Sequence, residues 1–292
     1  MRRLKNFFTF LGIVFFILIL FSIFKGFFSS KVAVPGEKIG VVKVEGVIKR
    51  SDSYVKLLDK LERNKEVKAI VLRVDSPGGV VGACQEIYDK VKEITKKKPI
   101  VVSMGSIAAS GGLYISVPAT KIVANPGTIT GSIGVILQSY NVKELADKVG
   151  IKVITVKSGK FKDLLNPFRE PDKGSLQILQ ALINDSYEQF VEAVAKGRKL
   201  PIEKVKKFAD GRVFTGRQAK ELGLVDELGS FEKAVEIARK LSKSPSAKVF
   251  EAKPERTFLQ KLLGEKTESM LNNLSRVLNG EVKDFYIMYL LD

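Results

Sequence analysis

The segment MGSIAASGG, residues 104–112, directly follows the apolar run PIVVS of residues 99–103. The run predicts a buried strand, and the glycines after it predict a tight turn into a helix, with Ser110 at the turn. A serine in that position gains the helix N-terminus, which favours developing negative charge. Ser110 is therefore a candidate nucleophile.

The chain contains no histidine, the residue that usually takes the proton from a nucleophilic serine. If Ser110 is a nucleophile, another base must activate it. The segment KSGKFKD, residues 157–163, follows an expected strand and offers Lys157, Lys160 and Lys162. Lowering the pKa of a lysine from about 10.4 to about 7 requires the cation to be destabilised by roughly 4–5 kcal/mol relative to the neutral amine, and burial can supply this. Residue types alone do not separate the three lysines.

A second glycine turn, DSPGGV at residues 75–80, follows the apolar segment at residues 67–74. Open α/β sheets bind ligands at the carboxyl ends of their parallel strands, so the two turns are expected at one edge. The backbone N–H groups of Gly79 and Gly111 could form an oxyanion hole there. The plainer alternative is that both are tight turns with close helix packing. The phosphate-binding motifs GxxxxGK[ST] and GxGxxG do not occur in the chain.

Apolar strands alternate with helical patterns along most of the chain, which predicts an α/β fold with a largely parallel sheet covered by helices. Strands are expected at residues 39–48, 67–74, 99–104, 121–124, 134–138, 152–156 and 247–251. Helices are expected at residues 54–64, 81–96, 142–149, 174–200, 202–210, 216–222 and 231–241, and again beyond residue 254.

The N-terminal region carries 18 uncharged, mostly apolar residues, Phe7–Phe24, preceded by three basic residues. A helix of this length spans roughly 27 Å, and the basic flank keeps the N-terminus in the cytoplasm. We expect an uncleaved signal anchor; a cleaved signal peptide is the competing interpretation. The expected organisation is a cytoplasmic tip and transmembrane anchor at 1–28, a linker at 29–38, a catalytic domain at 39–250 and an amphipathic helical extension at 251–292.

The composition excludes several classes of site. The one cysteine, Cys84, allows no intramolecular disulfide and is expected as a buried helix residue. Without histidine or a cysteine cluster we expect no metal, and no cofactor. The net charge is +17, but the basic residues are scattered among acidic ones, so nucleic-acid binding is not expected and anionic lipid headgroups are the better partner.

Five sequence blocks, in this order, resemble the signal peptide peptidase A family of membrane-bound serine proteases. They are DSPGG (75–79), MGSIAASGGLYIS (104–116), NPGTITGSIGV (125–135), KSGKFKDL (157–164) and RVFTGxxAxxxGLVD (212–226). The resemblance covers about residues 39–241 and the N-terminal anchor. It implies a Clp-protease/crotonase-like fold: parallel sheet layers covered by helices, with an N-terminal transmembrane helix and a helical C-terminal tail.

The same resemblance implies the roles of five residues. Ser110 matches the nucleophile, and Lys162 matches the general base. Ser132 matches the serine that orients this lysine, and Gly79 and Gly111 match the oxyanion donors. The base is then expected to be a buried lysine, and the neighbouring carboxylate of residue 163 must point away from it, since contact would favour the ammonium form.

The resemblance further implies a single-pass cell-membrane protein with its catalytic domain outside the cytoplasm. A homo-oligomer is expected, bringing Ser110 of one subunit toward Lys162 of its neighbour. The implied activity is a serine endopeptidase with a Ser-Lys dyad that degrades remnant signal peptides with apolar or small residues at the cut site. The alternatives are a related protease that cleaves a membrane scaffold partner, and a non-catalytic membrane scaffold. The apolar tip at residues 285–291 is expected to pack against a neighbouring subunit or to enter its peptide groove.

Overall fold

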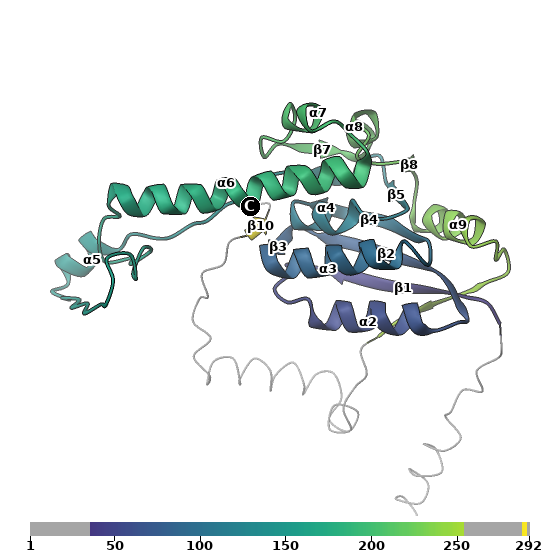
Figure 1. The fold of residues 1–292 in the computed structure, drawn as a ribbon, viewed down its shortest axis with the longest axis horizontal. Coiled ribbons are helices and arrows are strands. Elements are labelled where there is room, and N and C mark those ends of the chain that lie inside the picture. Colours follow the sequence, from purple (N-terminus) through teal and green to yellow (C-terminus); the bar gives the residue numbers. More distant parts are fainter. Residues whose placement is uncertain (1–35, 254–287, 291–292) are drawn as a thin grey trace, which may run out of the picture. The chain divides into compact units, whose positions relative to one another are not determined.

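The computed structural model describes residues 36–253 and 288–290, and these form an α/β fold (Figure 1). Eight strands make the main sheet, in the order β7-β6-β4-β2-β1-β9, with β5 pairing to β4 and to β8. Among these described strands, only β6 and β7 pair antiparallel. Their bounds are β1 Lys38–Glu45, β2 Val67–Ser76, β4 Ile100–Ala109, β5 Lys121–Ala124, β6 Ile129–Gly131, β7 Val213–Thr215, β8 Glu227–Leu228 and β9 Lys248–Glu251.

Helices cover both faces of this sheet because successive side chains of a strand point to opposite sides. In β1, Val42 and Val44 join the larger core, beneath helices α2, α3, α4 and the end of α6. Ile39 and Val41 join the smaller core, beneath α9. The helices are α2 Asp52–Arg63, α3 Val81–Ile94, α4 Gly111–Ser116, α5 Lys143–Lys148, α6 Lys173–Arg198, α7 Ile202–Lys206, α8 Gly216–Leu222 and α9 Phe231–Leu241.

The expected parallel, helix-covered sheet is confirmed, but two expected strands are wrong. Residues 134–138 form only one isolated bridge, and residues 152–156 form no strand. In the second segment Ile154 is 89% exposed and Val156 is 95% exposed, so these apolar side chains do not pack on the core of this chain. The short strands β6, β7 and β8 were missed, and the helix expected at 202–210 ends at Lys206.

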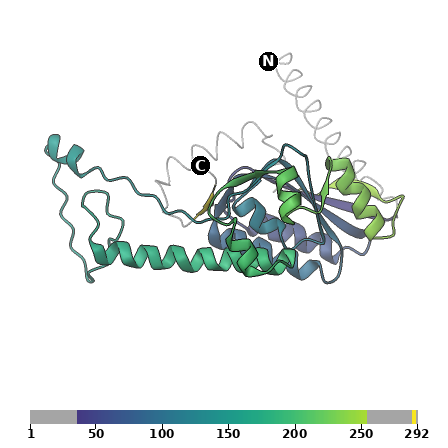
Figure 2. The same cartoon turned by 90° about the horizontal axis from the view of Figure 1, so that it is seen from above.

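Residues 137–172, which we call the arm, extend away from the sheet beside the N-terminal half of α6 in both views (Figures 1 and 2). The arm contains α5 and several exposed apolar side chains, which are Tyr140, Leu145, Val149, Ile151, Val153, Ile154 and Val156. Packing near Gly174, where an added Cβ would lie 3.2 Å from the ring of Phe161, joins the arm to the start of α6. The arm is thus an appendage with much unburied apolar surface.

The expected anchor at Phe7–Phe24 and the expected helix beyond residue 254 lie outside the described residues. Within residues 36–253 and 288–290, no helix has the length and apolar character needed to cross a bilayer. The boundaries proposed for the linker and the C-terminal extension likewise remain predictions.

Candidate active site

Ser110 occupies a strained turn between β4 and α4. Its backbone has φ 51° and ψ −116°, in a region that non-glycine residues rarely adopt. The side chain is buried, and its Oγ forms no hydrogen bond with any described residue. A buried hydroxyl without a partner is costly, and strain of this kind concentrates at functional sites. The geometry therefore singles out Ser110 independently of its sequence motif.

The two glycine turns meet beside Ser110, as the sequence predicts. A Cβ added at Gly111 would lie 3.0 Å from the backbone nitrogen of Gly79 and 2.6 Å from Sγ of Cys84. A Cβ at Gly79 would overlap the backbone oxygen of Ile48. Glycine is thus required at both positions by close approach of neighbouring atoms. The arrangement brings two backbone amides near the serine, as an oxyanion hole requires.

A short second sheet shows that this site can hold an extended peptide. Strand β3, Gly78–Val80, pairs antiparallel with β10, Met288–Leu290, so that Tyr289 lies opposite Gly79. On its other edge, Met288 donates its N–H to the carbonyl oxygen of Ile136 (3.3 Å) and accepts the N–H of Ile136 (3.2 Å). A segment held between two backbone edges is peptide binding by strand addition.

The segment that pairs with β3 is the C-terminal tip of the same chain. The tip was expected to pack against a neighbouring subunit or to enter its peptide groove, whereas β10 pairs with β3 of its own chain. Ile136, which pairs with Met288, forms the isolated bridge in the segment 134–138 where a strand was expected. A single bridge requires no run of strand residues, which is why the local pattern misjudged this segment.

Ser132 is the second serine with a positive φ, at 50°, and it is also buried. Its N–H donates to the carbonyl oxygen of Arg212 at 2.8 Å. The residue before it, Gly131, accepts the N–H of Ser110 at 2.8 Å. A cavity of about 590 Å³ opens beside Ser132, and its walls include residues 132–136 and part of α6. Ser132 is thus tied to the backbone of Ser110 and faces open space.

Lys162 lies on the arm, is exposed, and does not bond to Ser110. Within one chain the arm builds no core around Lys162, so its expected burial depends on a neighbouring subunit and stays a prediction. The other two lysines are engaged locally. Lys157 pairs with Asp163 and donates to the carbonyl oxygen of Lys160 at 3.0 Å, while Nζ of Lys160 lies 5.1 Å from the ring centre of Phe161.

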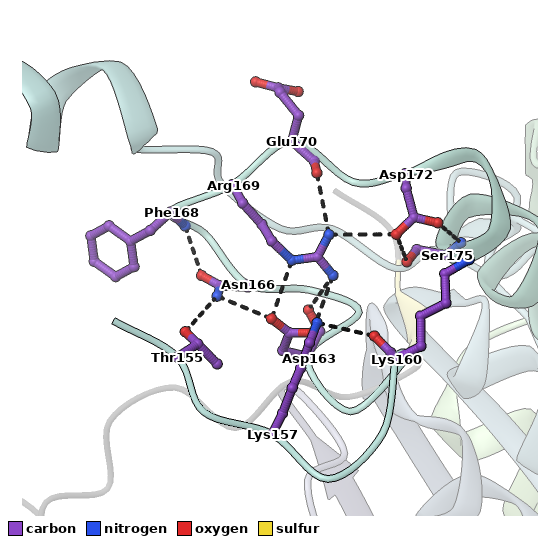
Figure 3. A network of polar contacts seen from close by, with 10 residues as sticks. All are labelled: Thr155, Lys157, Lys160, Asp163, Asn166, Phe168, Arg169, Glu170, Asp172 and Ser175. Carbon is purple, nitrogen blue, oxygen red and sulfur yellow. Dashed lines mark hydrogen bonds and ion pairs between the residues drawn. The ribbon is translucent and has the colours of Figure 1, made fainter. Parts of the chain in front are cut away.

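Asp163 is held on the side of the loop occupied by Lys157 and Arg169 (Figure 3). Arg169 donates from Nε to Oδ2 and from Nη2 to Oδ1, both at 3.2 Å. The Lys157 ammonium, followed by Arg169 and Asn166, holds the pKa of the Asp163 carboxyl well below its ordinary value. Its charge is thus satisfied by partners other than Lys162, as the sequence analysis required.

The role of Ser76 was not recognised from the sequence. Its buried hydroxyl donates to the carbonyl oxygen of Gly46 at 2.6 Å and accepts the N–H of Gly78 at 3.1 Å. These bonds fix the start of β3. The available signal was the DSPGG block itself, in which only the glycines were given a role. In the described part of the chain, no group of three or more Asp, Glu, Cys or His side chains is arranged to hold a metal ion.

Comparison with protein families agrees with this geometry. Residues 92–244 match the model of peptidase family S49, and residues 39–128 match that of Clp protease. The chain belongs to peptidase family S49. Both matched ranges include the Ser110 turn, and the Clp protease match also includes DSPGG; the two turns end neighbouring parallel strands.

Individual relatives of this S49 chain also carry protease names. It is 50% identical over 208 residues to a Synechocystis sp. protein provisionally named a protease, covering 70% of this chain and 75% of that protein. It is 39% identical to a provisionally named signal peptide peptidase SppA of Enterococcus faecium, over 73% of this chain and 63% of the relative. Protease 4 of Haemophilus influenzae is 38% identical, over 70% of this chain and 35% of that protein. The chain thus spans less than two thirds of the latter two.

Proposed function

We propose that this S49 protein is a membrane-anchored serine endopeptidase with a Ser110–Lys162 dyad that degrades remnant signal peptides. The observation that carries the proposal is a buried, strained and unpartnered Ser110 beside a groove that holds an extended peptide strand. A serine peptidase needs a nucleophile held next to a place where a peptide backbone can bind. The signal-peptide specificity rests on the sequence resemblance and on the name of one relative.

In the proposed reaction, neutral Nζ of Lys162 takes the proton of Ser110 Oγ as Oγ attacks the peptide carbonyl carbon. The N–H groups of Gly79 and Gly111 stabilise the resulting oxyanion. Collapse of the intermediate breaks the C–N bond, and the lysine proton passes to the leaving amine. Water then attacks the acyl carbon and gives one proton to Lys162; the C–Oγ bond breaks, the carboxylic acid product leaves, and Lys162 returns the proton to Ser110 Oγ. Ser132 orients the lysine.

The dyad is proposed to form between subunits. Within one chain Lys162 is exposed on the arm and Ser110 Oγ has no partner, so the missing base is available from a second copy. The exposed apolar side chains of the arm provide surface for that contact, and the cavity beside Ser132 provides space. Assembly would also remove water from the lysine, which favours its neutral form.

The test compares full-length variants in detergent or liposomes, using a fluorogenic signal-peptide substrate. Ser110→Ala and Lys162→Ala are each expected to be inactive while assembling normally by size-exclusion chromatography with light scattering. Lys160→Ala, two residues away on the same loop, is the control and should retain most activity. Near-normal cleavage by the Lys162→Ala variant would overturn the dyad.

Mixing the two inactive variants tests the subunit arrangement. In a head-to-tail ring, one contact in four of a 1:1 mixture pairs an intact serine with an intact lysine, so about a quarter of the wild-type activity should return. No recovery after confirmed subunit exchange contradicts a shared dyad. Labelling of Ser110 by a fluorophosphonate separates a protease from a non-catalytic scaffold. Profiling cleaved membrane proteins separates signal peptides from a scaffold partner as substrate.

A further inference from the structure

The pairing of β2 with β4 changes register at Asp75, just before the catalytic turns. Val74 lies opposite Met104, whereas Ser76 lies opposite Ala108. One residue of β2, Asp75, therefore faces three residues of β4, at positions 105–107. This is a β-bulge, a feature that bends a strand and redirects the residues after it.

The side chain of Asp75 fills this bulge. Its Oδ1 accepts the backbone N–H of Ile107 at 3.1 Å. Its Cγ and Oδ2 lie so close to Gly105 that a Cβ added there would be 2.6 Å from each. The strand ladder leaves the N–H of a bulged residue without a backbone partner, and here the carboxylate supplies the acceptor.

The bulge decides where Ser110 is delivered. Before it, residues 101–104 of β4 pair with β5; after it, residues 107–109 pair with β6. The N–H of Ile107 therefore lies where β4 leaves one neighbour and joins the next. Three residues later, Ser110 donates its N–H to Gly131 at the end of β6. The bond at Ile107 is thus one of the contacts that fix the segment carrying the nucleophile, and it lies at the start of that segment.

The rest of the site is held by other groups. Thr128 donates to the carbonyl oxygen of Gly105 at 2.7 Å, and Thr130 donates to that of Ala108 at 2.6 Å. Ser76 holds β3, the strand on which a peptide pairs. Asp75 and Ser76, adjacent in sequence, therefore serve different halves of the site, the first the nucleophile and the second the peptide edge.

We infer that Asp75 is a positioning residue for Ser110: its carboxylate holds the β4 bulge that aims the nucleophile. The inference rests on the proposed serine protease function. The role needs a hydrogen-bond acceptor of this size and no proton transfer, because Asp75 acts through the backbone of Ile107. Asparagine retains such an acceptor and alanine does not.

The experiment uses the full-length enzyme, with active sites titrated by a fluorophosphonate so that rates refer to folded, competent Ser110. Asp75→Ala is expected to lower kcat per titrated site about 10- to 100-fold, the range for leaving a buried N–H unpaired, with KM within about twofold. Asp75→Asn should remain within about threefold of wild type in kcat. A merely structural role would reduce the number of titrated sites and leave their kcat unchanged.

A double-mutant cycle tests the contact itself. Gly105→Ala pushes a methyl group against the carboxylate and should lower kcat about tenfold by displacing Asp75. In the Asp75→Ala background Cγ and Oδ2 are absent and only the Cβ of residue 75 stays close, at 2.9 Å, so the same change should lower kcat by about threefold or less. Gly127→Ala, where an added Cβ meets nothing within 4 Å, is the control and should change kcat little.

The inference is overturned by an unchanged kcat per site in Asp75→Ala, or by full additivity in the cycle. Failure of the underlying function gives a different result, because wild-type Ser110 would then not react with the fluorophosphonate at all. If Asp75→Ala does not fold, Gly105→Ala still tests the inference, because an unchanged kcat per titrated site in that variant would overturn it. Equal, large kcat losses in both Asp75→Asn and Asp75→Ala would also contradict it, since asparagine retains the acceptor.

Discussion

Phe190 attaches the helix that bears the arm to the layer that carries Ser110, and its replacement by alanine gives a quantitative test of this fold. Phe190 is fully buried in the second half of α6. Its ring centre lies 5.1 Å from that of Tyr114 at an interplanar angle of 68°, and Tyr114 lies 5.0 Å from Tyr88. Tyr114 follows Ser110 by four residues and donates its N–H to the Ser110 carbonyl oxygen at 2.9 Å.

The expected loss of unfolding free energy in Phe190→Ala is about 3–5 kcal/mol, because the lost aromatic burial is accompanied by a cavity that the packed core refills only partly. For a domain of this size each kcal/mol lowers Tm by about 2–4 °C, so the predicted fall is about 6–20 °C. At temperatures where the variant stays folded, we expect reduced turnover, because both the arm and α4 lose a shared anchor.

The assay is thermal unfolding of the full-length protein in detergent, followed by circular dichroism, with peptide turnover measured on the same samples. Leu241→Ala, at the end of α9 and 40% exposed, is the control and should change stability by less than about 0.5 kcal/mol. A fall in Tm below about 3 °C for Phe190→Ala, or an equal fall for Leu241→Ala, would refute the argument.

Two further predictions concern residues around the candidate oxyanion amides. Burial raises the pKa of the Cys84 thiol from 9.0 to about 12, so folded protein at pH 8.5 should resist alkylation, and labelling without unfolding would contradict this burial. The thiol ionises at lower pH in the unfolded chain than in the folded one. The stability that its neutral form contributes is therefore complete below pH 9 and is lost as pH rises toward 12. In denaturant titrations, the stability of the wild type relative to Cys84→Ala should fall over the same pH range. Gly79→Ala should lower kcat/KM at least about 100-fold, since the new methyl group overlaps Ile48 and must displace the oxyanion amide. Gly82→Ala, which meets open space, should leave it within about threefold, and similar losses in both variants would exclude this steric explanation.

Local sequence patterns predicted most of the longer elements that pack on this chain's own core. The strand Lys121–Ala124 and the helices Gly216–Leu222 and Phe231–Leu241 were predicted to the residue, because their apolar spacing directly reflects the face that is buried. The same spacing misled at residues 152–156, where the apolar side chains are exposed on the arm. A pattern records that a surface is apolar and does not record which surface covers it.

The sequence by itself determined that no histidine can activate Ser110, because the chain has none. It also placed a serine and two glycine turns at the ends of adjacent parallel strands. Only the tertiary structure decided that the two turns touch, that Asp75 fills a bulge, and that Lys162 lies away from Ser110 within one chain. These are contacts between residues far apart in sequence, set by strand register and by the path of the arm, and neither has a local signature.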